Sequence, residues 1–285
     1  CLQSVLTQDY PDLEILVLDD ASTRYHLCDR LSAIFKDPRL HCFRVETPLG
    51  VAGGRNFLMQ KASGDIFCVI DDDACFADTQ AVARYVEVFV QYPDVGILAA
   101  KIIDHRDGRK QLLLPFSKYW RKKQPQLEDQ FSRVSYFLGG GHAVRRVVIE
   151  RCGPYSDELL FGEEELDLSY RAINAGFTLM YIPDVVVHHY PQPSLLNQSR
   201  LRDELYYHVR NRFFIACKYL PARYLPAYLT IWLVRYGWQA FRSDQFGDFL
   251  SGIGSGLRLI RRTHREPLSG QAISYLKANY GRLWY

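Results

Sequence analysis

The stretch IFCVIDDD, residues 66–73, decides how this chain is expected to fold. Five apolar residues in a row, with Gly64 just before them, predict a strand that is buried on both faces. The run ends abruptly in Asp71, Asp72 and Asp73. Three adjacent carboxylates repel one another, so they need either a compensating charge or full exposure to water.

A divalent cation is one way to compensate these charges. Side chains alternate along an extended chain, so we expect Asp71 and Asp73 to share one face while Asp72 points the other way. Carboxylate oxygens with no histidine or cysteine next to them in the sequence suit Mg²⁺ or Mn²⁺. The alternative is a solvated acidic loop that holds no ligand.

Outward from this stretch, strands and helices alternate along the chain. That order is typical of an α/β fold with a mainly parallel sheet covered by helices on both faces. Ligands of such sheets bind beyond the carboxyl ends of the strands, where Asp71–Asp73 and the earlier pair Asp19–Asp20 lie. The expected elements are helices over 1–8, 25–36, 55–62 and 79–91, and strands over 15–18, 40–45, 66–70 and 95–100.

The patterns after residue 100 are weaker. Residues 104–135 are polar, rich in Lys and Gln and irregular, so we expect a long loop or an insertion there. A run of three glycines follows at Gly139–Gly141. Beyond it the sequence predicts helices over 143–151 and 163–175, and strands over 177–182 and 185–188.

Three further segments contain residues that could act on a ligand. The expected glycine loop over 50–54 allows close backbone approach, and Arg55 adds charge for a phosphate. Glutamates crowd the start of the helix in 163–167, which raises at least one carboxyl pKa toward the value that a general base needs. His188 and His189 end an apolar strand, where a histidine can bind a metal. Taken singly, each has an ordinary structural explanation: a turn, a helix-dipole contact or a surface histidine.

The C-terminal part of the chain differs in charge from the rest. Residues 201–285 carry 13 basic against 5 acidic residues and are rich in aromatics, whereas the whole chain has a net charge of only +3. Such a region could face nucleic acid, an anionic membrane or simply water. The apolar run 227–234 is shorter than the ~20 residues that span a bilayer. We expect these helices either to lie in a membrane interface or, by preference, to pack on the body of the protein.

The cysteines and the first residue also bear on the setting of the protein. The seven cysteines form no C-x-x-C pair, which argues against a disulfide framework or a zinc site and suits a reducing compartment. The sequence has no signal peptide pattern and opens at Cys1 without an initiator Met, so we treat it as a fragment of a longer protein.

Together these segments resemble one known family. Over roughly residues 1–190 the chain is similar to the family 2 glycosyltransferases, inverting enzymes with the GT-A fold. Six ordered stretches carry the resemblance: SVLTQDYPDLEILVLDDAS (4–22), LGVAGGRN (49–56), FCVIDDDA (67–74), GGGHAVRR (139–146), GPYSDELLFGEEELDLSYR (153–171) and IPDVVVHH (182–189).

The resemblance implies a role for each of these segments. Glu165 matches the catalytic base and Glu164 its acidic neighbour, while Asp167 and Arg171 match the acid and arginine that follow on the same helix. Asp73 would be the direct metal ligand, and His188 is the alternative to His189 if the register differs by one. The implied donor-binding residues are Asp20, Arg55, Asp71, Asp72 and Gly140, and the implied ligands of Mn²⁺ or Mg²⁺ are Asp73, Asp71 and His189.

The chain departs from the family pattern in two places that affect the site. The family's first strand is absent, because the sequence starts in the helix that follows it. The base position usually carries Asp, and Glu165 stands there, which leaves Glu164 as an alternative base. We expect residues 1–195 to form the catalytic domain and 196–285 a helical region that is a candidate for membrane association.

The resemblance favours one function over two others. It implies an inverting, metal-dependent transfer of sugar from a nucleotide-diphosphate donor to the hydroxyl of a glycan or a lipid-linked saccharide. The expected setting is the cytoplasm, at the inner face of a membrane. The alternatives are a metal-dependent nucleotidyltransferase, and a degenerate module that binds nucleic acid or membrane; nucleic acid is the least favoured partner.

Overall fold

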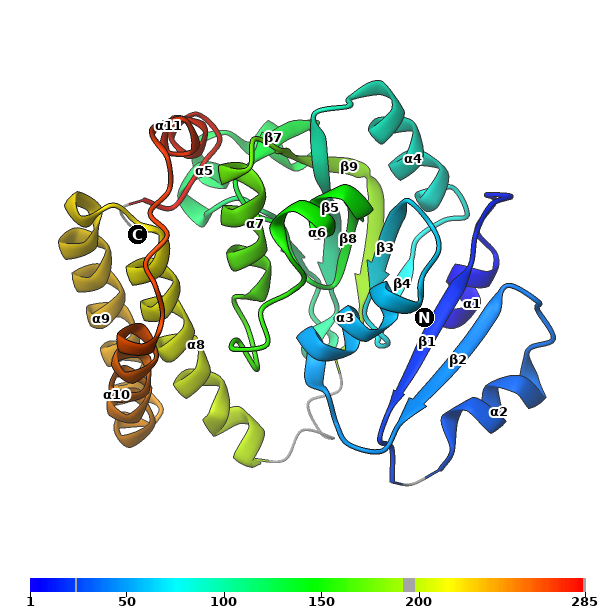
Figure 1. Cartoon of the computed structure of the whole chain (residues 1–285), viewed down its shortest axis with the longest axis horizontal. Coiled ribbons are helices and arrows are strands. Elements are labelled where there is room, and N and C mark those ends of the chain that lie inside the picture. Colours follow the sequence, from blue (N-terminus) through cyan, green and yellow to red (C-terminus); the bar gives the residue numbers. More distant parts are fainter. Residues whose placement is uncertain (24, 192–197, 284–285) are drawn as a thin grey trace.

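Strands of two sheets form the centre of the protein, and the computed structural model describes residues 1–23, 25–191 and 198–283 (Figure 1). β1 (Ile15–Asp20) and β2 (Leu40–Val45) pair in parallel as a small sheet. The larger sheet has the order β3-β8-β5-β9-β4, with β6 beside β5 and β7 beside β9. Its strands are β3 (Ile66–Ile70), β4 (Ala74–Phe76), β5 (Val95–Asp104), β6 (Gln111–Leu113), β7 (Ser132–Val134), β8 (Gly141–Arg145) and β9 (Thr178–His189).

Helices cover both faces of the larger sheet and continue beyond it as a C-terminal group (Figure 1). The helices between residues 1 and 174 are α1 (Leu2–Leu6), α2 (Leu27–Ile34), α3 (Gly50–Lys61), α4 (Ala81–Gln91), α5 (Lys118–Lys123), α6 (Arg146–Cys152) and α7 (Glu164–Asn174). The C-terminal helices are α8 (Gln198–Tyr219), α9 (Leu225–Arg242), α10 (Phe246–Arg262) and α11 (Gly270–Ala278).

The alternation of side chains along β5 divides the core into two layers. Ile97 and Ala99 pack in the layer that contains α6, α7 and the C-terminal helices, whereas Leu98 and Ala100 pack in the layer that contains α4. Both faces of β5 are therefore covered, which explains why its sequence is apolar without interruption. The fold class expected from the sequence, α/β with a helical C-terminal region, is confirmed.

The larger sheet is more mixed than the alternation of elements predicted. β5 and β9 pair in parallel, but β3–β8, β5–β8, β4–β9, β5–β6 and β7–β9 are antiparallel. The strands that the sequence did not predict are of two kinds: β4, β6 and β7 have three residues each, and β8 lies where a helix was expected. Residues 104–135, expected as a loop, contain β6, α5 and β7, and the helix expected over 143–151 begins only at Arg146 because 141–145 is strand β8.

Two other boundaries differ from expectation. The glycines expected in a loop at 50–54 form the start of helix α3, where Gly50 has a φ of +71°. The two strands expected at 177–182 and 185–188 are one strand, β9, which carries an irregularity in its pairing with β5 near Pro183. A proline removes one ladder hydrogen bond without ending the strand, and that is why the sequence suggested a break.

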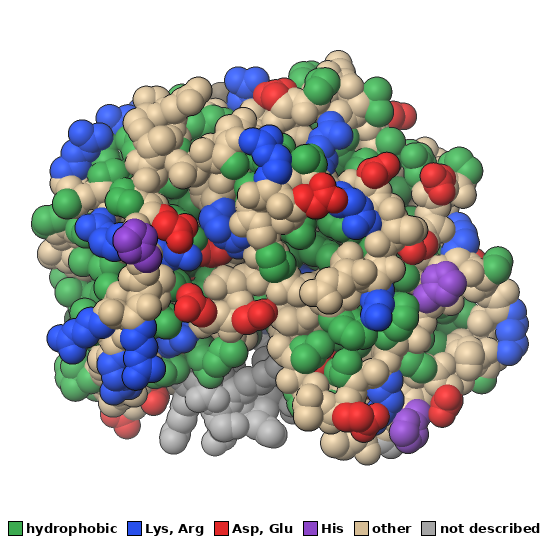
Figure 2. Space-filling model, viewed as in Figure 1, with side chains coloured by type: hydrophobic (Ala, Val, Ile, Leu, Met, Phe, Trp, Pro, Cys, Tyr) green, Lys and Arg blue, Asp and Glu red, His purple; other side chains and the backbone are tan. Residues whose placement is uncertain are grey.

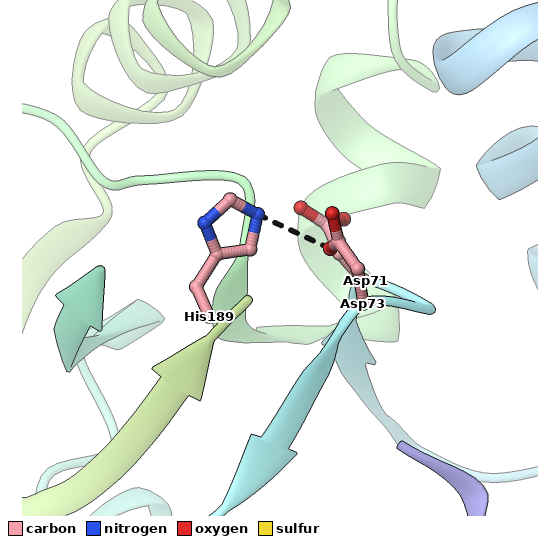
Figure 3. Close-up of side chains that lie close together, drawn as sticks. All are labelled: Asp71, Asp73 and His189. Carbon is pink, nitrogen blue, oxygen red and sulfur yellow. Dashed lines mark ion pairs between the residues drawn. The ribbon is translucent and has the colours of Figure 1, made fainter. Parts of the chain in front are cut away.

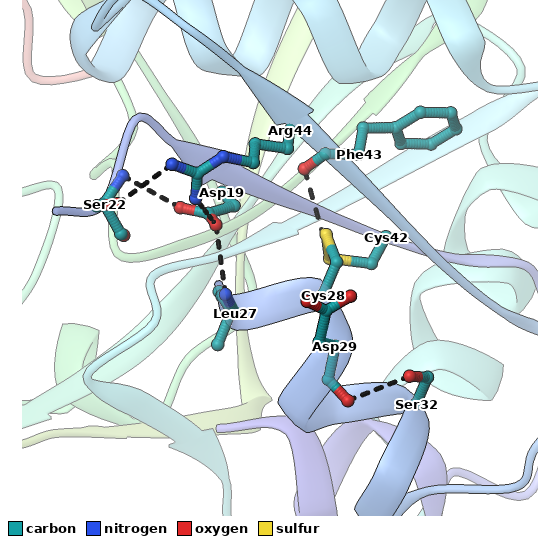
Figure 4. The surroundings of a disulfide bond; sticks show 9 residues. All are labelled: Asp19, Ser22, Leu27, Cys28, Asp29, Ser32, Cys42, Phe43 and Arg44. Carbon is teal, nitrogen blue, oxygen red and sulfur yellow. Dashed lines mark hydrogen bonds and ion pairs between the residues drawn. A yellow bond between two sulfur atoms is a disulfide. The ribbon is translucent and has the colours of Figure 1, made fainter. Parts of the chain in front are cut away.

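The cysteine spacings argued against a disulfide framework, yet one pair of cysteines is bridged. Cys28 on α2 and Cys42 on β2 form a disulfide, with their Cα atoms 5.4 Å apart (Figure 4). α2 is the crossover between β1 and β2 and lies back against β2, so residues 14 positions apart meet in space. Spacing alone could not reveal this proximity. The other five cysteines are free, and no larger disulfide framework exists in the described chain.

The C-terminal helices pack on the body of the protein, which was the preferred of the two arrangements expected from the sequence. Side chains of α8, α9 and α11 belong to the same buried core as those of α6 and α7. Tyr275 of α11 donates its hydroxyl to the backbone oxygen of Leu179 on β9, at 3.1 Å. In the described part of the chain no helix is long and apolar enough to cross a membrane. The expected boundary at 195/196 lies outside the described residues.

Candidate active site

Asp71, Asp73 and His189 come together at one end of the larger sheet (Figure 3). Asp71–Asp73 form the tight turn between β3 and β4, in which the Ala74 amide donates to the backbone oxygen of Asp71 at 3.1 Å. β4 pairs with β9 so that Ala74 lies opposite His189. One ligand atom from each of the three side chains lies within 4.8 Å of the others. This geometry suits a metal ion, and His189 belongs to it rather than His188, whose Nδ1 lies 2.9 Å from His105 Nε2.

A buried aspartate fixes the orientation of His189. Asp104, at the end of β5, is 4% exposed, and its Oδ1 lies 3.2 Å from His189 Nδ1. The other ring nitrogen, Nε2, lies 3.1 Å from Asp73 Oδ1. These hydrogen bonds, first that with Asp73, raise the pKa of His189, and His189 lowers the pKa of Asp73. In many metal sites a carboxylate accepts a hydrogen bond from one ring nitrogen of a histidine and so orients the other nitrogen toward the metal. Asp104 is placed to do this for His189.

Arg55 joins this cluster to the acidic start of α7. Its guanidinium lies 3.2 Å from Asp71 Oδ1, 3.0 Å from Glu165 Oε1 and 3.6 Å from Glu164 Oε1. It also donates to the backbone oxygen of Gly139 at 3.3 Å. Burial alone would lower the pKa of Arg55, but the surrounding carboxylates, Glu165 foremost, raise it. Arg55 is thus a fixed cation between the two acidic groups.

The glycine run lies against these side chains. A Cβ at Gly139 would lie 2.1 Å from Glu165 Oε1 and 2.8 Å from Arg55 Nη2, so this position has no room for a side chain. A Cβ at Gly140 would lie 3.4 Å from Asp71 Oδ2. The glycine run therefore lies between Asp71 on one side and Glu165 and Arg55 on the other.

Glu164 and Glu165 are neighbours with different surroundings. The Glu165 side chain is 17% exposed and is paired with Arg55. The Glu164 side chain is 6% exposed, and its Oε2 has no hydrogen-bond partner among the described residues. Burial, followed by the charge of Glu165, raises the pKa of Glu164. Glu164 therefore holds its proton more tightly than an ordinary glutamate does.

The helix α7 is anchored by the C-terminal helix α8. Glu163, just before α7, has a φ of +72° and forms a buried ion pair with Arg212 of α8. Burial opposes ionisation of this carboxyl, yet Arg212 lowers its pKa to about 2. Asn211 donates to the backbone oxygens of Phe161 and Gly162, both at 2.9 Å. α8 therefore holds the segment that presents Glu164 and Glu165.

Asp167 and Arg171 support α7 rather than face the metal cluster. Arg171 Nη2 donates to Asp167 Oδ2 at 2.6 Å, and the Tyr219 hydroxyl donates to Asp167 Oδ1 at 2.7 Å. Arg171 also donates to the backbone oxygen of Gly153 at 2.9 Å. Both residues thus join α7 to its neighbours.

The remaining predicted residues occupy different places. Asp20 accepts hydrogen bonds from the amides of Leu49 and Gly50 at 2.7 and 3.0 Å, so it braces the start of α3. Asp72 is exposed and is not part of the group formed by Asp71, Asp73 and His189.

The sequence placed Asp19 at the end of a strand beside Asp20 but gave it no role, and its carboxylate is buried beside Arg44 at 2.5 Å (Figure 4). Burial would raise the pKa of Asp19, but hydrogen bonds from Ser22, Leu27 and Arg44 lower it to about 2. Asp104, Asn211 and Arg212 were missed as well. The one sequence signal for Asp104 is an acid at the end of an apolar strand, the same signal that marked Asp71.

A sequence model of the family described as "Glycosyl transferase family 2" matches residues 1–153. An "N-acetylglucosaminyltransferase" of Rhizobium meliloti (strain 1021) is 25% identical over 198 residues, which are 66% of this chain and 46% of that protein. The chain thus spans less than half the length of this curated relative.

Two solved structures share the fold. One is the mannosyltransferase PcManGT from Pyrobaculum calidifontis in complex with GDP-Man and Mn²⁺, with a TM-score of 0.55, 18% identity, and coverage of 97% of this chain and 69% of that one. The other is GalNAc-T7 with UDP, GalNAc and Mn²⁺, with a TM-score of 0.54, 19% identity, and coverage of 74% of this chain and 47% of that one.

Proposed function

The chain belongs to glycosyl transferase family 2 and has the GT-A fold, and from this premise we propose a specific reaction. It moves a sugar from a nucleotide-diphosphate donor to a hydroxyl acceptor, with inversion and with the help of a divalent metal. The observation that carries the proposal is Arg55, which lies between Asp71 of the metal cluster and Glu165. Donor phosphates and an acceptor hydroxyl would then meet across one buried guanidinium.

Asp71, Asp73 and His189 would hold the metal ion. Two carboxylates and one imidazole form a donor set that suits Mn²⁺, and Mg²⁺ would use mainly the carboxylates. The metal would neutralise charge on the departing diphosphate. Both similar structures hold Mn²⁺ together with a nucleotide or a nucleotide sugar, which supports this part of the proposal.

We propose the donor site to extend from this cluster toward the start of α3. Arg55 would hold the nucleotide diphosphate by charge, with Asp71 and Asp72 at its edge. Gly140 would leave room for the sugar beside Asp71, and Asp20 would contact the nucleobase from the end of β1. Residues 1–195 would form this catalytic domain, and 196–285 the helical region attached to it.

Glu165 is the proposed general base. Arg55 holds its carboxylate at 3.0 Å and also contacts Asp71, so the base would lie beside the bound donor. It would take the proton of the acceptor hydroxyl while that oxygen attacks the anomeric carbon from the face opposite the diphosphate, so that the configuration inverts. Glu164 is the second candidate, because its raised pKa keeps it closer to the range in which a base operates.

Calorimetric titration of the full chain with a panel of nucleotide sugars, with and without Mn²⁺, tests the proposal. We expect Mn²⁺-dependent binding of one donor and loss of that binding in Asp73→Ala, with Asp184→Ala on the exposed part of β9 as a matched control. Release of nucleoside diphosphate on turnover supports glycosyl transfer. Release of pyrophosphate would instead favour the nucleotidyltransferase, and no donor binding by folded protein would favour a binding module.

A further inference from the structure

Helix α9 exposes an apolar stripe although its other face is already buried. Tyr228, Trp232 and Tyr236 face α8, and Arg212 of α8 lies 4.4 Å above the Trp232 ring. Large apolar side chains recur on the opposite face with the spacing i, i+3, i+7, i+10. They are Ile231, Val234, Trp238 and Phe241, which are 42%, 68%, 63% and 75% exposed. A helix that is apolar on both sides needs a second partner besides the protein core.

Helix α10 adds to the same surface. Phe246, Leu250 and Leu257 are exposed along one of its faces. Its other face lies tightly on α8, because a Cβ at Gly252 would come within 2.8 Å of a backbone oxygen. α9 and α10 also pack on each other through Gly237. We call the seven exposed side chains on these two helices the outer apolar surface: Ile231, Val234, Trp238, Phe241, Phe246, Leu250 and Leu257.

Arginines border the outer apolar surface. Arg235 and Arg242 lie on α9, and three more lie in the last turns of α10: Arg258, Arg261 and Arg262. None of these five side chains forms an ion pair with another residue that the structure describes. Figure 2 shows green apolar and blue basic side chains together at the left edge of the molecule, where Figure 1 places α9 and α10.

A pocket between α8 and α10 collects part of this positive charge. It has a volume of about 220 Å³ and is lined by Arg210, Ser255, Arg258, Leu259 and Arg262. Arg210 is held in place because it donates to the backbone oxygen of Glu158 at 2.8 Å. The lining contains three guanidinium groups and no carboxylate, which favours an anion.

We propose that the outer apolar surface docks on an anionic membrane, whose lipid phosphates the arginines at its rim would contact. Aromatic side chains such as Trp238 and Phe241 suit the boundary between acyl chains and headgroups. Arginines at the rim add attraction to anionic lipids. The charge distinguishes this occupant from a second copy of the chain, because two such surfaces would bring their unpaired arginines together. The inference concerns a surface and does not depend on the reaction proposed above.

Vesicle flotation with the full chain tests the proposal, with phosphatidylcholine vesicles that contain or lack phosphatidylglycerol. We expect binding only to the anionic vesicles, weakening as salt rises. Arg258→Gln/Arg262→Gln should bind about 25-fold more weakly, at about fivefold per arginine. Trp238→Ser/Phe241→Ser should lose at least as much. Matched controls away from the surface are Lys118→Gln/Lys122→Gln on α5 and Val90→Ser on α4, which should bind as the wild type does.

Three results would overturn the proposal. One is equal binding to both kinds of vesicle, and another is full binding by the Trp238→Ser/Phe241→Ser variant. The third is a dimer in sedimentation analysis that Trp238→Ser/Phe241→Ser dissociates, because the surface would then be an interface between copies. Donor binding in calorimetry is measured separately, so a failure here is distinguishable from a failure of the proposed reaction.

Discussion

Two groups of carboxylates lie on either side of Arg55, and the protein treats them differently. At the start of α7, Glu163 is paired with Arg212, Glu165 with Arg55 and Asp167 with Arg171. At the turn after β3, Asp71 shares Arg55, and Asp73 forms its one ion pair among the described residues with the imidazole of His189. The first group is compensated largely by the chain's own cations. The second is left with uncompensated negative charge, and that difference is why we place the metal there.

Within the α7 group, some carboxylates hold the helix in place and others are candidates for a role in the reaction. In the α7 group, the buried ion pairs at Glu163 and Asp167 hold the helix, and Glu165 is the member that lies closest to the metal cluster through Arg55. Asp71, Asp73 and His189 are each partly exposed, as residues of a site that exchanges ligands must be. Substitutions in the two groups should therefore fail in different ways: some in catalysis, some in folding and some in metal affinity.

The largest effect should come from Glu165→Gln. This change removes the proposed base and keeps the size of the side chain, so kcat should fall by roughly 10²–10⁴-fold. Mn²⁺-dependent donor binding should persist, because the metal ligands are unchanged. Steady-state kinetics together with calorimetry on the same preparation would measure both. If the folded variant turns over at the wild-type rate, Glu165 is not the base and Glu164→Gln becomes the next variant.

Arg212→Met should affect folding before catalysis. Without Arg212 the buried carboxylate of Glu163 keeps only the imidazole of His208 among the described residues, at 3.5 Å, so the loss should be at most about 3–5 kcal/mol. Urea denaturation would measure the free energy of unfolding. Arg235→Met is a matched control, because Arg235 also lies over the Trp232 ring, at 4.8 Å, yet forms no ion pair with a described residue. Equal losses in the two variants would mean that the ring contact, and not the ion pair with Glu163, is what Arg212 contributes.

The residues that sequence reasoning found and missed follow from the same contrast. Asp71 and Asp73 were predictable because they are adjacent in the sequence at the end of one apolar strand. Asp104 was not, because it lies 85 residues from His189 and meets it only through the parallel register of β5 and β9. Arg212 was missed for a similar reason, since its partner Glu163 is 49 residues away on another helix.

The fold shows the same limit. Long apolar runs such as that of β5 identified the strands at the centre of the sheet. Short strands carry too few residues for a period to be visible, and β4, β6 and β7 have three each. The disulfide between Cys28 and Cys42 depends on where a crossover helix lies, which no spacing rule states. Local patterns therefore predicted elements, and the pairings between distant elements had to come from the structure.

Asp104→Asn should have a moderate effect on Mn²⁺ affinity, which tests whether Asp104 orients His189. The amide no longer carries the charge that orients His189, so Mn²⁺ affinity should fall about 10–100-fold. Asp184→Asn, on an exposed position of β9, is the control and should leave the affinity unchanged. Calorimetric titration with Mn²⁺ alone measures the effect without turnover. An unchanged affinity in Asp104→Asn would show that His189 does not need this partner to bind metal.

The smallest effect is expected at Glu164, the member of the α7 group whose nearest cation, Arg55 at 3.6 Å, is the most distant. Its Oε2 has no partner among the described residues, and burial, followed by the charge of Glu165, raises its pKa in the folded protein. A carboxyl with a raised folded pKa binds its proton more tightly when folded than when unfolded. Stability from this group is therefore fully present below the ordinary pKa of 4.5 and is lost as pH rises through the folded value.

Glu164→Gln removes that pH-dependent loss. The variant should gain stability relative to the wild type between pH 5 and pH 8, by on the order of 1 kcal/mol, and the difference should be constant below about pH 4. Urea denaturation across this pH range measures it. Glu150→Gln is the control, because it removes one exposed carboxylate on α6, away from the α7 group. If Glu164→Gln loses stability with rising pH as the wild type does, Arg55 already compensates both glutamates. Every carboxylate of the α7 group would then be compensated by a cation, in contrast to Asp71–Asp73.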